Sequence, residues 1–146
     1  MSQLPTSLEA MRAIKAGTVT PPPIAELIGL ELDRVDPGEV VFAIEPRADL
    51  GNGMGMLHGG LIATIMDFAC SVAVATELPA GNLMTTIELK ISYLRPAPVD
   101  GGRIEATGRA LRVGRGVGFA DALARDESGE LVAQATSSLA IRKLKG

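Results

Sequence analysis

The 146-residue sequence has little of what metal sites, disulfides and aromatic ligand platforms require. It holds one cysteine, one histidine, one tyrosine, three phenylalanines and no tryptophan. A single cysteine excludes a disulfide within the chain, and one cysteine with one histidine excludes the usual zinc sites built from these residues. So few aromatic side chains leave no sequence signal for recognition of an aryl ligand by ring stacking.

A long uncharged apolar run and an excess of positive charge are also missing. No stretch of about 18 apolar residues is present, which argues against a membrane span. Residues 1–17 lack the apolar core of a secretory signal. The formal net charge is −3, whereas nucleic-acid binding needs a dense basic face. We therefore expect a cytoplasmic protein that binds neither nucleic acid nor membrane.

The sequence does contain enough apolar material for one buried core. Hydrophobic residues make up 47% of the chain and charged residues 21%, which is typical of a globular domain of this length. We divide the chain into an N-terminal extension, residues 1–22, and a folded domain, residues 23–146. The extension carries a predicted helix over 7–16, which Ser7 can cap and Gly17 ends, and then breaks at three consecutive prolines.

The predicted order of elements in the domain is two strands, one long helix and four strands. A short helix over 23–28 precedes the first two strands, which join at a Pro37-Gly38 turn. The four later strands are separated by Gly-containing turns, and we expect an antiparallel sheet joined by hairpins. The first of these four alternates, and its two faces hold different residues: Ile87, Leu89, Ile91 and Tyr93 on one, and Thr86, Glu88, Lys90 and Ser92 on the other.

The long helix, expected over 58–78, is apolar around most of its circumference. From Leu61 to Thr76 its only charged residue is Asp67. A helix of this kind is buried on most sides, and a long antiparallel sheet curled around it would bury it in this way. The expected class is therefore α+β with the hotdog fold, in which about six antiparallel strands wrap around one long central helix.

Asp67 needs an explanation, because an ionised carboxylate in an apolar place is unfavourable. It either bonds a buried polar group and stiffens the core, or reaches a cavity as a base or nucleophile. The helix start favours the second interpretation, since Gly59 and Gly60 allow a ligand to approach first-turn N–H donors that suit a developing oxyanion. Asn52 adds a nearby amide donor. Alternatively, the glycines only allow a tight turn into the helix.

Spacing along the helix separates these groups. Gly59 and Asp67 are eight residues apart, which is about 12 Å at 1.5 Å per residue. A carbonyl held by Gly59 is thus out of reach of a water held by Asp67 of the same chain. If both serve one reaction, they belong to different subunits, and two antiparallel copies of the helix in a two-fold dimer would form two equivalent interface sites.

The stretch from Asn52 to Asp67, NGMGMLHGGLIATIMD, resembles the signature of hotdog-fold acyl-CoA thioesterases of the PaaI-like family. The asparagine, the HGG and the helical aspartate fall at that family's spacing, and TTIELKISYLRPAP looks like its first long strand after the helix. The resemblance covers about residues 27–141. It implies hydrolysis of an acyl-CoA to a carboxylic acid and coenzyme A by a homodimer, with a dimer of dimers as a further expectation. This chemistry needs no metal or organic cofactor.

The resemblance also implies roles for individual residues. Asn52 and the backbone N–H of Gly59 would polarise the thioester carbonyl. Asp67 of the other subunit would activate the attacking water or attack directly. Thr86 matches a position where a hydroxyl helps to hold that water, although it is equally read as an ordinary strand residue. His58 precedes the oxyanion glycine and would shape the loop or take part directly.

Candidates for substrate contact lie around this set. Three lie near the helix start and would contact the acyl group or pack the loop: Met54, Met56 and Gly60. Five basic residues would hold the coenzyme A phosphates, because Arg matches phosphate geometry, or are solvated strand ends: Arg95, Arg112, Arg115, Arg142 and Lys143. We expect Cys70 to be a buried core thiol.

Two other functions stay open at this point. A hotdog dehydratase or hydratase of hydroxyacyl thioesters needs an acid/base pair, commonly a histidine and a carboxylate, whereas the sole histidine here directly precedes the oxyanion glycine. A non-enzymatic acyl-CoA sensor needs an output segment, whereas residues 1–22 are short, broken by proline and not basic. Neither aliphatic nor small aromatic acyl groups are excluded by the sequence.

Overall fold

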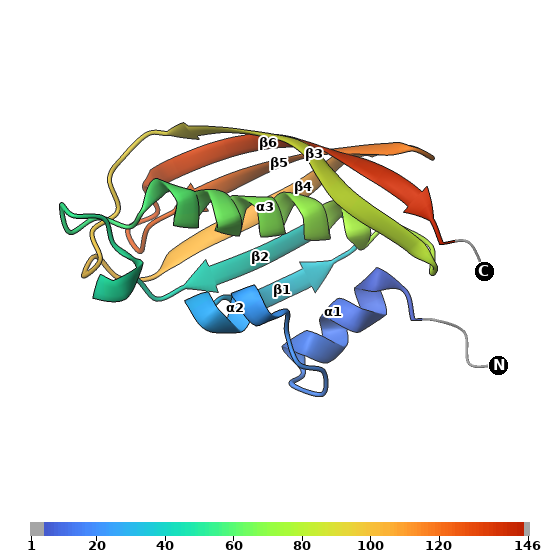
Figure 1. Cartoon of the computed structure of the whole chain (residues 1–146), viewed down its shortest axis with the longest axis horizontal. Helices are drawn as coiled ribbons and strands as arrows, with labels where there is room; N and C mark the ends of the chain where they lie inside the picture. Colours follow the sequence, from blue (N-terminus) through green and yellow to red (C-terminus); the bar gives the residue numbers. More distant parts are fainter. Residues whose placement is uncertain (1–4, 145–146) are drawn as a thin grey trace.

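A computed structural model describes residues 5–144 and shows one antiparallel sheet curved around a single long helix (Figure 1). The helices are α1 (Ser7–Lys15), α2 (Pro23–Ile28) and α3 (Gly59–Ala75), with a 3₁₀ turn at Ala48–Leu50. The strands are β1 (Glu31–Asp36), β2 (Glu39–Ile44), β3 (Asn82–Tyr93), β4 (Ile104–Val113), β5 (Val117–Arg125) and β6 (Leu131–Lys143). The predicted α+β hotdog architecture is confirmed. The outer ends of the two predicted segments, residues 1–4 and 145–146, lie outside the described residues.

The strand order in the sheet is β1-β2-β4-β5-β6-β3, and every neighbouring pair is antiparallel. Strands β4, β5 and β6 follow one another through hairpins, as predicted. Strand β3 does not pair with β4, because β2 occupies that place. It crosses instead to the far edge, where Asn82 lies opposite Lys143 and Tyr93 opposite Ala133 of β6. The prediction of four consecutive hairpin-joined strands is therefore wrong for β3.

Two helix ends differ from the predictions. Helix α1 is capped by Thr6 rather than Ser7: the Thr6 side chain accepts the N–H of Glu9, and the Glu9 carboxylate accepts the N–H of Thr6. This reciprocal pair satisfies two free donors at once. Helix α3 ends at Ala75, with Thr76 as its C-cap, and so is shorter than predicted. Among the described residues, no helix is long and apolar enough to cross a membrane.

Helix α3 lies against the concave face of the sheet, in the centre of Figure 1. Its inner side is buried, with Ile65, Met66 and Cys70 at most 1% exposed. The closest approach is to β4, where a Cβ added to Gly108 would lie 2.0 Å from the carbonyl oxygen of Ala69. Because real atoms never approach so closely, the missing side chain at Gly108 permits the observed helix-to-sheet distance.

A β-bulge interrupts β3 at Ile87. The register with β6 skips this residue, between Thr86 and Glu88. One extra residue exchanges the two faces of the strand across the bulge. Thr86 therefore lies on the inner face with Leu89, where both line one hollow, and Ile87 is 62% exposed. The predicted alternation is wrong here, because it placed Thr86 and Leu89 on different faces of the strand and Ile87 on the same face as Leu89.

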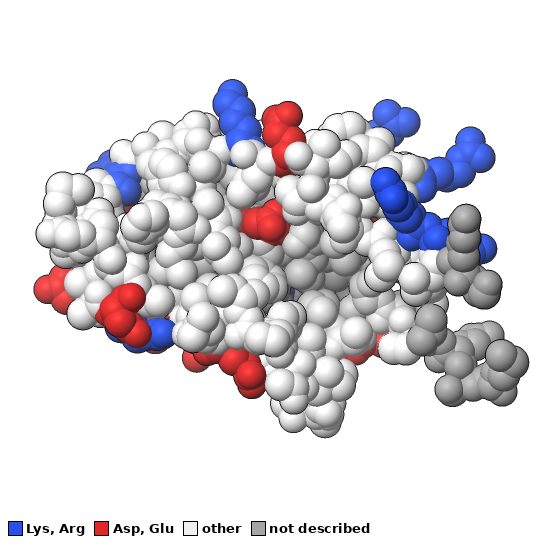
Figure 2. Space-filling model, in the orientation of Figure 1, with Lys and Arg blue, Asp and Glu red and all other residues white. Residues whose placement is uncertain are grey.

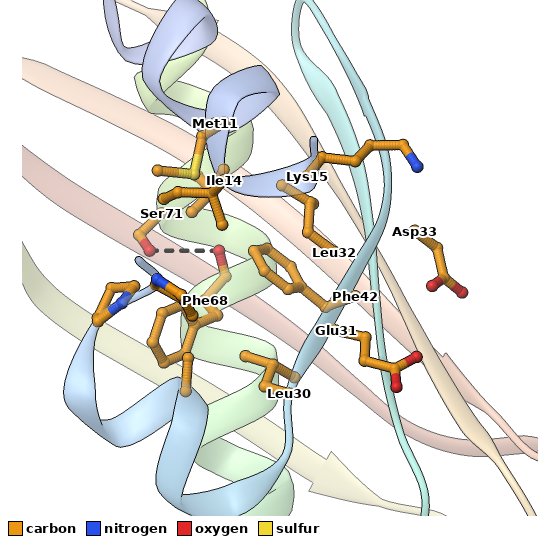
Figure 3. A pocket seen from close by; sticks show the side chains of 14 residues that line it. Met11, Ile14, Lys15, Leu30, Glu31, Leu32, Asp33, Phe42, Phe68 and Ser71 are labelled. Atoms are coloured by element: carbon orange, nitrogen blue, oxygen red, sulfur yellow. Dashed lines mark hydrogen bonds between the residues drawn. The ribbon is translucent and has the colours of Figure 1, made fainter. Parts of the chain in front are cut away.

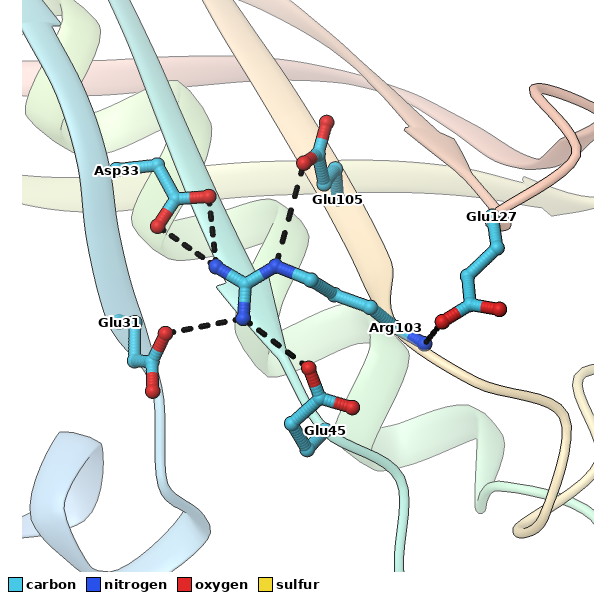
Figure 4. A network of polar contacts seen from close by, with 6 residues as sticks. All are labelled: Glu31, Asp33, Glu45, Arg103, Glu105 and Glu127. Carbon is cyan, nitrogen blue, oxygen red and sulfur yellow. Dashed lines mark hydrogen bonds and ion pairs between the residues drawn. The ribbon is translucent and has the colours of Figure 1, made fainter.

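An arginine before β4 ties together strands on the outer side of the sheet. Five acidic residues surround it, as Figure 4 shows: Glu31, Asp33, Glu45, Glu105 and Glu127. The shortest contacts join Nη2 of Arg103 to both carboxylate oxygens of Asp33, at 2.7 Å each. These hydrogen bonds, above all the one that Arg103 donates to Asp33, raise the pKa of Arg103. The carboxylates of Glu31 and Asp33 thus bind Arg103 on the outer side of the sheet.

Candidate active site

The side of α3 that the sheet leaves uncovered carries Asp67. Half-exposed residues recur along it at helical spacing: Ala63, Thr64, Asp67, Phe68 and Ser71. Figure 2 shows this side of the molecule, which is largely uncharged. Asp67 is thus neither sealed in the core nor fully in water, and a ligand or a second chain can reach it.

The Asp67 carboxylate is held by Thr86. The Thr86 hydroxyl donates to Oδ1 of Asp67 at 2.8 Å, a contact that the bulge in β3 makes geometrically available. Oδ2 of Asp67 has no hydrogen-bond partner within residues 5–144. Together with Gly60 and Leu89, the pair lines a shallow hollow beside the helix. An ionised carboxylate with one free oxygen can accept a hydrogen bond from a water molecule there.

The start of α3 leaves one backbone donor free. His58 is the N-cap, and its Nδ1 accepts the N–H of Gly60 at 2.9 Å. The N–H of Gly59 has no acceptor in the described part of the chain. Such a first-turn donor also lies at the positive end of the helix dipole. Of the two glycines, Gly59 is therefore the one whose N–H can bind a carbonyl oxygen, while His58 fixes the turn.

Asn52 lies beside this donor, in the loop before the helix. Its Oδ1 accepts the N–H groups of Met54 at 2.8 Å and Met56 at 3.2 Å. These bonds orient the amide, and its Nδ2 has no acceptor among residues 5–144. Asn52, Gly59 and the two methionines line a common hollow of about 310 Å³. The loop therefore brings a second N–H donor into the hollow that contains Gly59.

Sequence reasoning missed Tyr93 as part of this hollow. Its hydroxyl donates to the carbonyl oxygen of Gly59 at 2.6 Å. Its ring also covers the glycine, because a Cβ added to Gly59 would lie 3.3 Å from Tyr93. No local signal connects the two positions, since the contact arises only because β3 crosses to the edge beside β6. Tyr93 thus holds Gly59, the residue whose N–H is the free donor, through the carbonyl group on its other side.

The predicted basic residues do not gather at one place in the chain. Arg95 lines the hollow that contains Gly59. Arg112, Arg115 and Lys143 line a separate cleft of about 720 Å³ next to the C-terminal end of α3. Figure 2 shows basic side chains gathered at this end, on the right. Within one chain, Arg95 therefore lies at the opposite end of the helix from Arg112 and Arg115, and Arg142 lines neither hollow.

Cys70 takes no part in the two hollows. It is fully buried, and burial, reinforced by the carboxylates of Asp67 and Asp121, raises the pKa of its thiol to about 12. A thiol that stays protonated is a poor nucleophile. The expectation of a core thiol is confirmed. Within the described residues, no three His, Cys, Asp or Glu side chains are grouped so that they could hold a metal ion.

Known thioesterases resemble this chain in sequence and in fold. The sequence profile of the Thioesterase superfamily matches residues 54–133. The medium/long-chain acyl-CoA thioesterase YigI of Escherichia coli is 30% identical over 154 residues, covering 94% of this chain and 97% of that protein. Human acyl-coenzyme A thioesterase 13 is 32% identical over 100 residues, covering 67% and 69%. A thioesterase family protein from Silicibacter pomeroyi superposes with a TM-score of 0.81 at 26% identity, covering 97% and 98%. The chain therefore belongs to the thioesterase superfamily, and it is a thioester hydrolase.

Proposed function

We propose that the chain hydrolyses acyl-CoA thioesters at two equivalent sites between the subunits of a homodimer. The observation that carries this proposal is the separation of two complementary hollows along α3. One holds the free N–H donors at Gly59 and Asn52, and the other holds the carboxylate of Asp67. They lie about 12 Å apart along the helix, so one chain alone does not unite them. The acyl-CoA class of substrate is supported by the relatives named above.

The proposed reaction uses one water and no other reactant. Asp67 accepts a proton from a water as the water oxygen adds to the thioester carbonyl carbon. The carbonyl oxygen becomes an oxyanion and accepts the N–H of Gly59 and Nδ2 of Asn52 from the other subunit. Collapse of this intermediate breaks the carbon–sulfur bond. The thiolate of coenzyme A leaves with the proton held by Asp67, and the carboxylic acid remains.

Two surfaces support a two-fold dimer. Strand β3 is at the edge of the sheet, and its exposed apolar residues include Leu83 at 56% and Ile87 at 62% exposure. A long unpaired edge favours pairing with another strand. The uncovered side of α3 lies next to this edge, so a second copy can place its own α3 antiparallel to the first. A dimer of dimers stays a prediction.

We assign the coenzyme A phosphates to the cleft lined by Arg112, Arg115 and Lys143. In the antiparallel pair, the end of α3 beside this cleft extends about 12 Å past Gly59 of the other subunit. The cleft is therefore within reach of a coenzyme A arm that extends from the thioester along this end of the helix. Arg95 is the weaker candidate, because its guanidinium is paired with Glu130 at 3.0 Å.

The test measures thiol release from a panel of aliphatic and aromatic acyl-CoAs, and then mixes two inactive variants. Asn52→Ala and Asp67→Asn each remove one group from both sites of their own dimers. A mixed dimer regains one complete site, so refolding equal amounts together should restore roughly a quarter of the wild-type rate. A mixture no more active than its parents would overturn the intersubunit site. A wild-type chain that releases no thiol from any acyl-CoA would overturn the substrate assignment.

A further inference from the structure

We infer that the cavity enclosed by α1, α2 and α3 binds the aliphatic chain of the acyl group, and that Met11 and Ile14 of α1 limit its length. This inference rests on the proposed hydrolysis of acyl-CoA. It assigns a function to the N-terminal extension, which lies outside the hotdog sheet and takes no part in the chemistry.

The cavity has the size and lining of a small-molecule site. It measures about 390 Å³, within the range of about 300–1,000 Å³ typical of ligand pockets. Apolar side chains from α1, β1, β2, α3 and the residue before β1 converge in it, as Figure 3 shows: Met11, Ile14, Leu30, Leu32, Phe42 and Phe68.

The cavity begins one turn of α3 beyond Asp67. Ser71 and Phe68 of α3 both line it, and Ser71 follows Asp67 by four residues on the same side of the helix. That spacing is about 6 Å along the axis. A thioester carbonyl placed next to Asp67 can therefore direct its carbon chain past Ser71 into the cavity.

Apart from Ser71, the polar side chains of the lining point away from the cavity, and Figure 3 shows the Lys15 ammonium extending outward. The Ser71 hydroxyl already donates to the carbonyl oxygen of Phe68 at 3.3 Å. Glu31 and Asp33 direct their carboxylates away, toward Arg103 (Figures 3 and 4). No buried side-chain nitrogen or oxygen lacks a partner within residues 5–144. Because burying an unpaired hydroxyl or carboxylate is unfavourable, the fitting ligand is a hydrocarbon chain.

Helix α1 is only partly packed against the rest of the chain. None of its residues is buried, yet Met11 and Ile14 direct apolar side chains into the cavity. An apolar helix face that remains half-exposed gains stabilisation when further apolar surface covers it. A hydrocarbon chain between α1 and Phe68 supplies that surface. Met11 adds a flexible side chain that adapts to its occupant.

The test compares kcat/KM for saturated acyl-CoAs from butyryl to palmitoyl in the wild type and in Ile14→Trp. The larger side chain should exclude two or more methylenes, lowering kcat/KM for decanoyl-CoA and longer substrates about tenfold or more. Butyryl-CoA should change less than about twofold. Arg12→Trp adds the same bulk on the exposed side of α1 and should leave the profile unchanged. Met11→Trp provides a second variant if Ile14→Trp does not fold.

A binding measurement separates failure of this inference from failure of the proposed function. In protein labelled with [¹³C]methyl methionine, decanoate should shift the Met11 resonance, which Met11→Leu assigns. That shift supports the cavity even if no thioester is hydrolysed. Thiol release with no shift at Met11, or with equal effects of Ile14→Trp on all chain lengths, would overturn the inference and leave the proposed function standing.

Discussion

The two sides of helix α3 differ in almost every respect. Its inner side, with Met66 and Cys70, is completely buried against the sheet, whereas the adjacent Asp67 lies on the partly uncovered outer side with Ser71. Met66 and Asp67 are neighbours in sequence and have unrelated surroundings. The inner side consists of buried apolar side chains, whereas the outer side carries an accessible carboxylate and is only partly packed. Stability and activity should therefore respond to substitutions on different sides of one helix.

The largest effect should follow from Asp67→Asn on the outer side. The change keeps the shape and removes the base, so the rate of thiol release should fall by about 10²–10⁴-fold. The free energy of unfolding should change by less than about 1 kcal/mol, because the residue is half-exposed and its Oδ1 contact with Thr86 has an amide equivalent. A steady-state assay and urea denaturation measure the two quantities. Full activity in the variant would make Asp67 a structural residue.

The inner side should show the opposite pattern in Gly108→Ala. The added Cβ would meet the Ala69 carbonyl oxygen at 2.0 Å, so helix and sheet must separate. The expected loss is about 3 kcal/mol in the free energy of unfolding. Gly116→Ala is the matched control, because nothing lies within 4 Å of its added Cβ. Equal stability of the two variants in urea would contradict the close approach.

Tyr93→Phe tests the helix start with a smaller change. It keeps the ring against Gly59 and removes the hydroxyl that donates to the Gly59 carbonyl oxygen. A less firmly held oxyanion donor should lower kcat about tenfold at nearly constant KM, and the lost hydrogen bond should lower stability by about 1 kcal/mol. Equal loss of stability with unchanged kcat would limit Tyr93 to a structural role.

The smallest effect concerns Cys70 and alkaline pH. Its pKa is about 12 in the folded chain against 9.0 ordinarily, so above pH 9 the unfolded chain ionises while the native thiol keeps its proton. The contribution of Cys70 to the free energy of unfolding is therefore complete below about pH 9 and declines as the pH rises toward 12. Cys70→Ala should lack this part of the alkaline decline in urea titrations. Rapid alkylation of the native thiol at pH 9 would contradict its burial.

The features that could be predicted from the sequence are those that local pattern determines. The continuous apolar surface of α3 indicated a helix wrapped by a sheet, and Asp67 was identified because it is the only charge in that segment. The bounds of α2 agree with the prediction, since proline marks its start and glycine its end. Gly59 and Asn52 were identified as donors from the helix start and the neighbouring amide.

The features that could not be predicted depend on contacts between distant parts of the chain. A strand's own residues do not specify its neighbour, so the pairing of β3 with β6 had no local signal. The bulge at Ile87 is likewise set by register against β6. The hydrogen bonds of Thr86 with Asp67 and Tyr93 with Gly59 follow from that placement.

The bulge has a consequence for which changes of length the chain can tolerate. Strand β3 consists of two segments whose inward and outward residues alternate out of phase, joined at Ile87. A substitution leaves both phases intact. Deleting Ile87 would bring the segments into one phase and keep Thr86, Leu89 and Ile91 on the inner face, whereas a deletion elsewhere in β3 would turn the residues on one side of it to the other face. Insertions and deletions in β3 away from Ile87 should therefore be selected against far more strongly than changes in its composition.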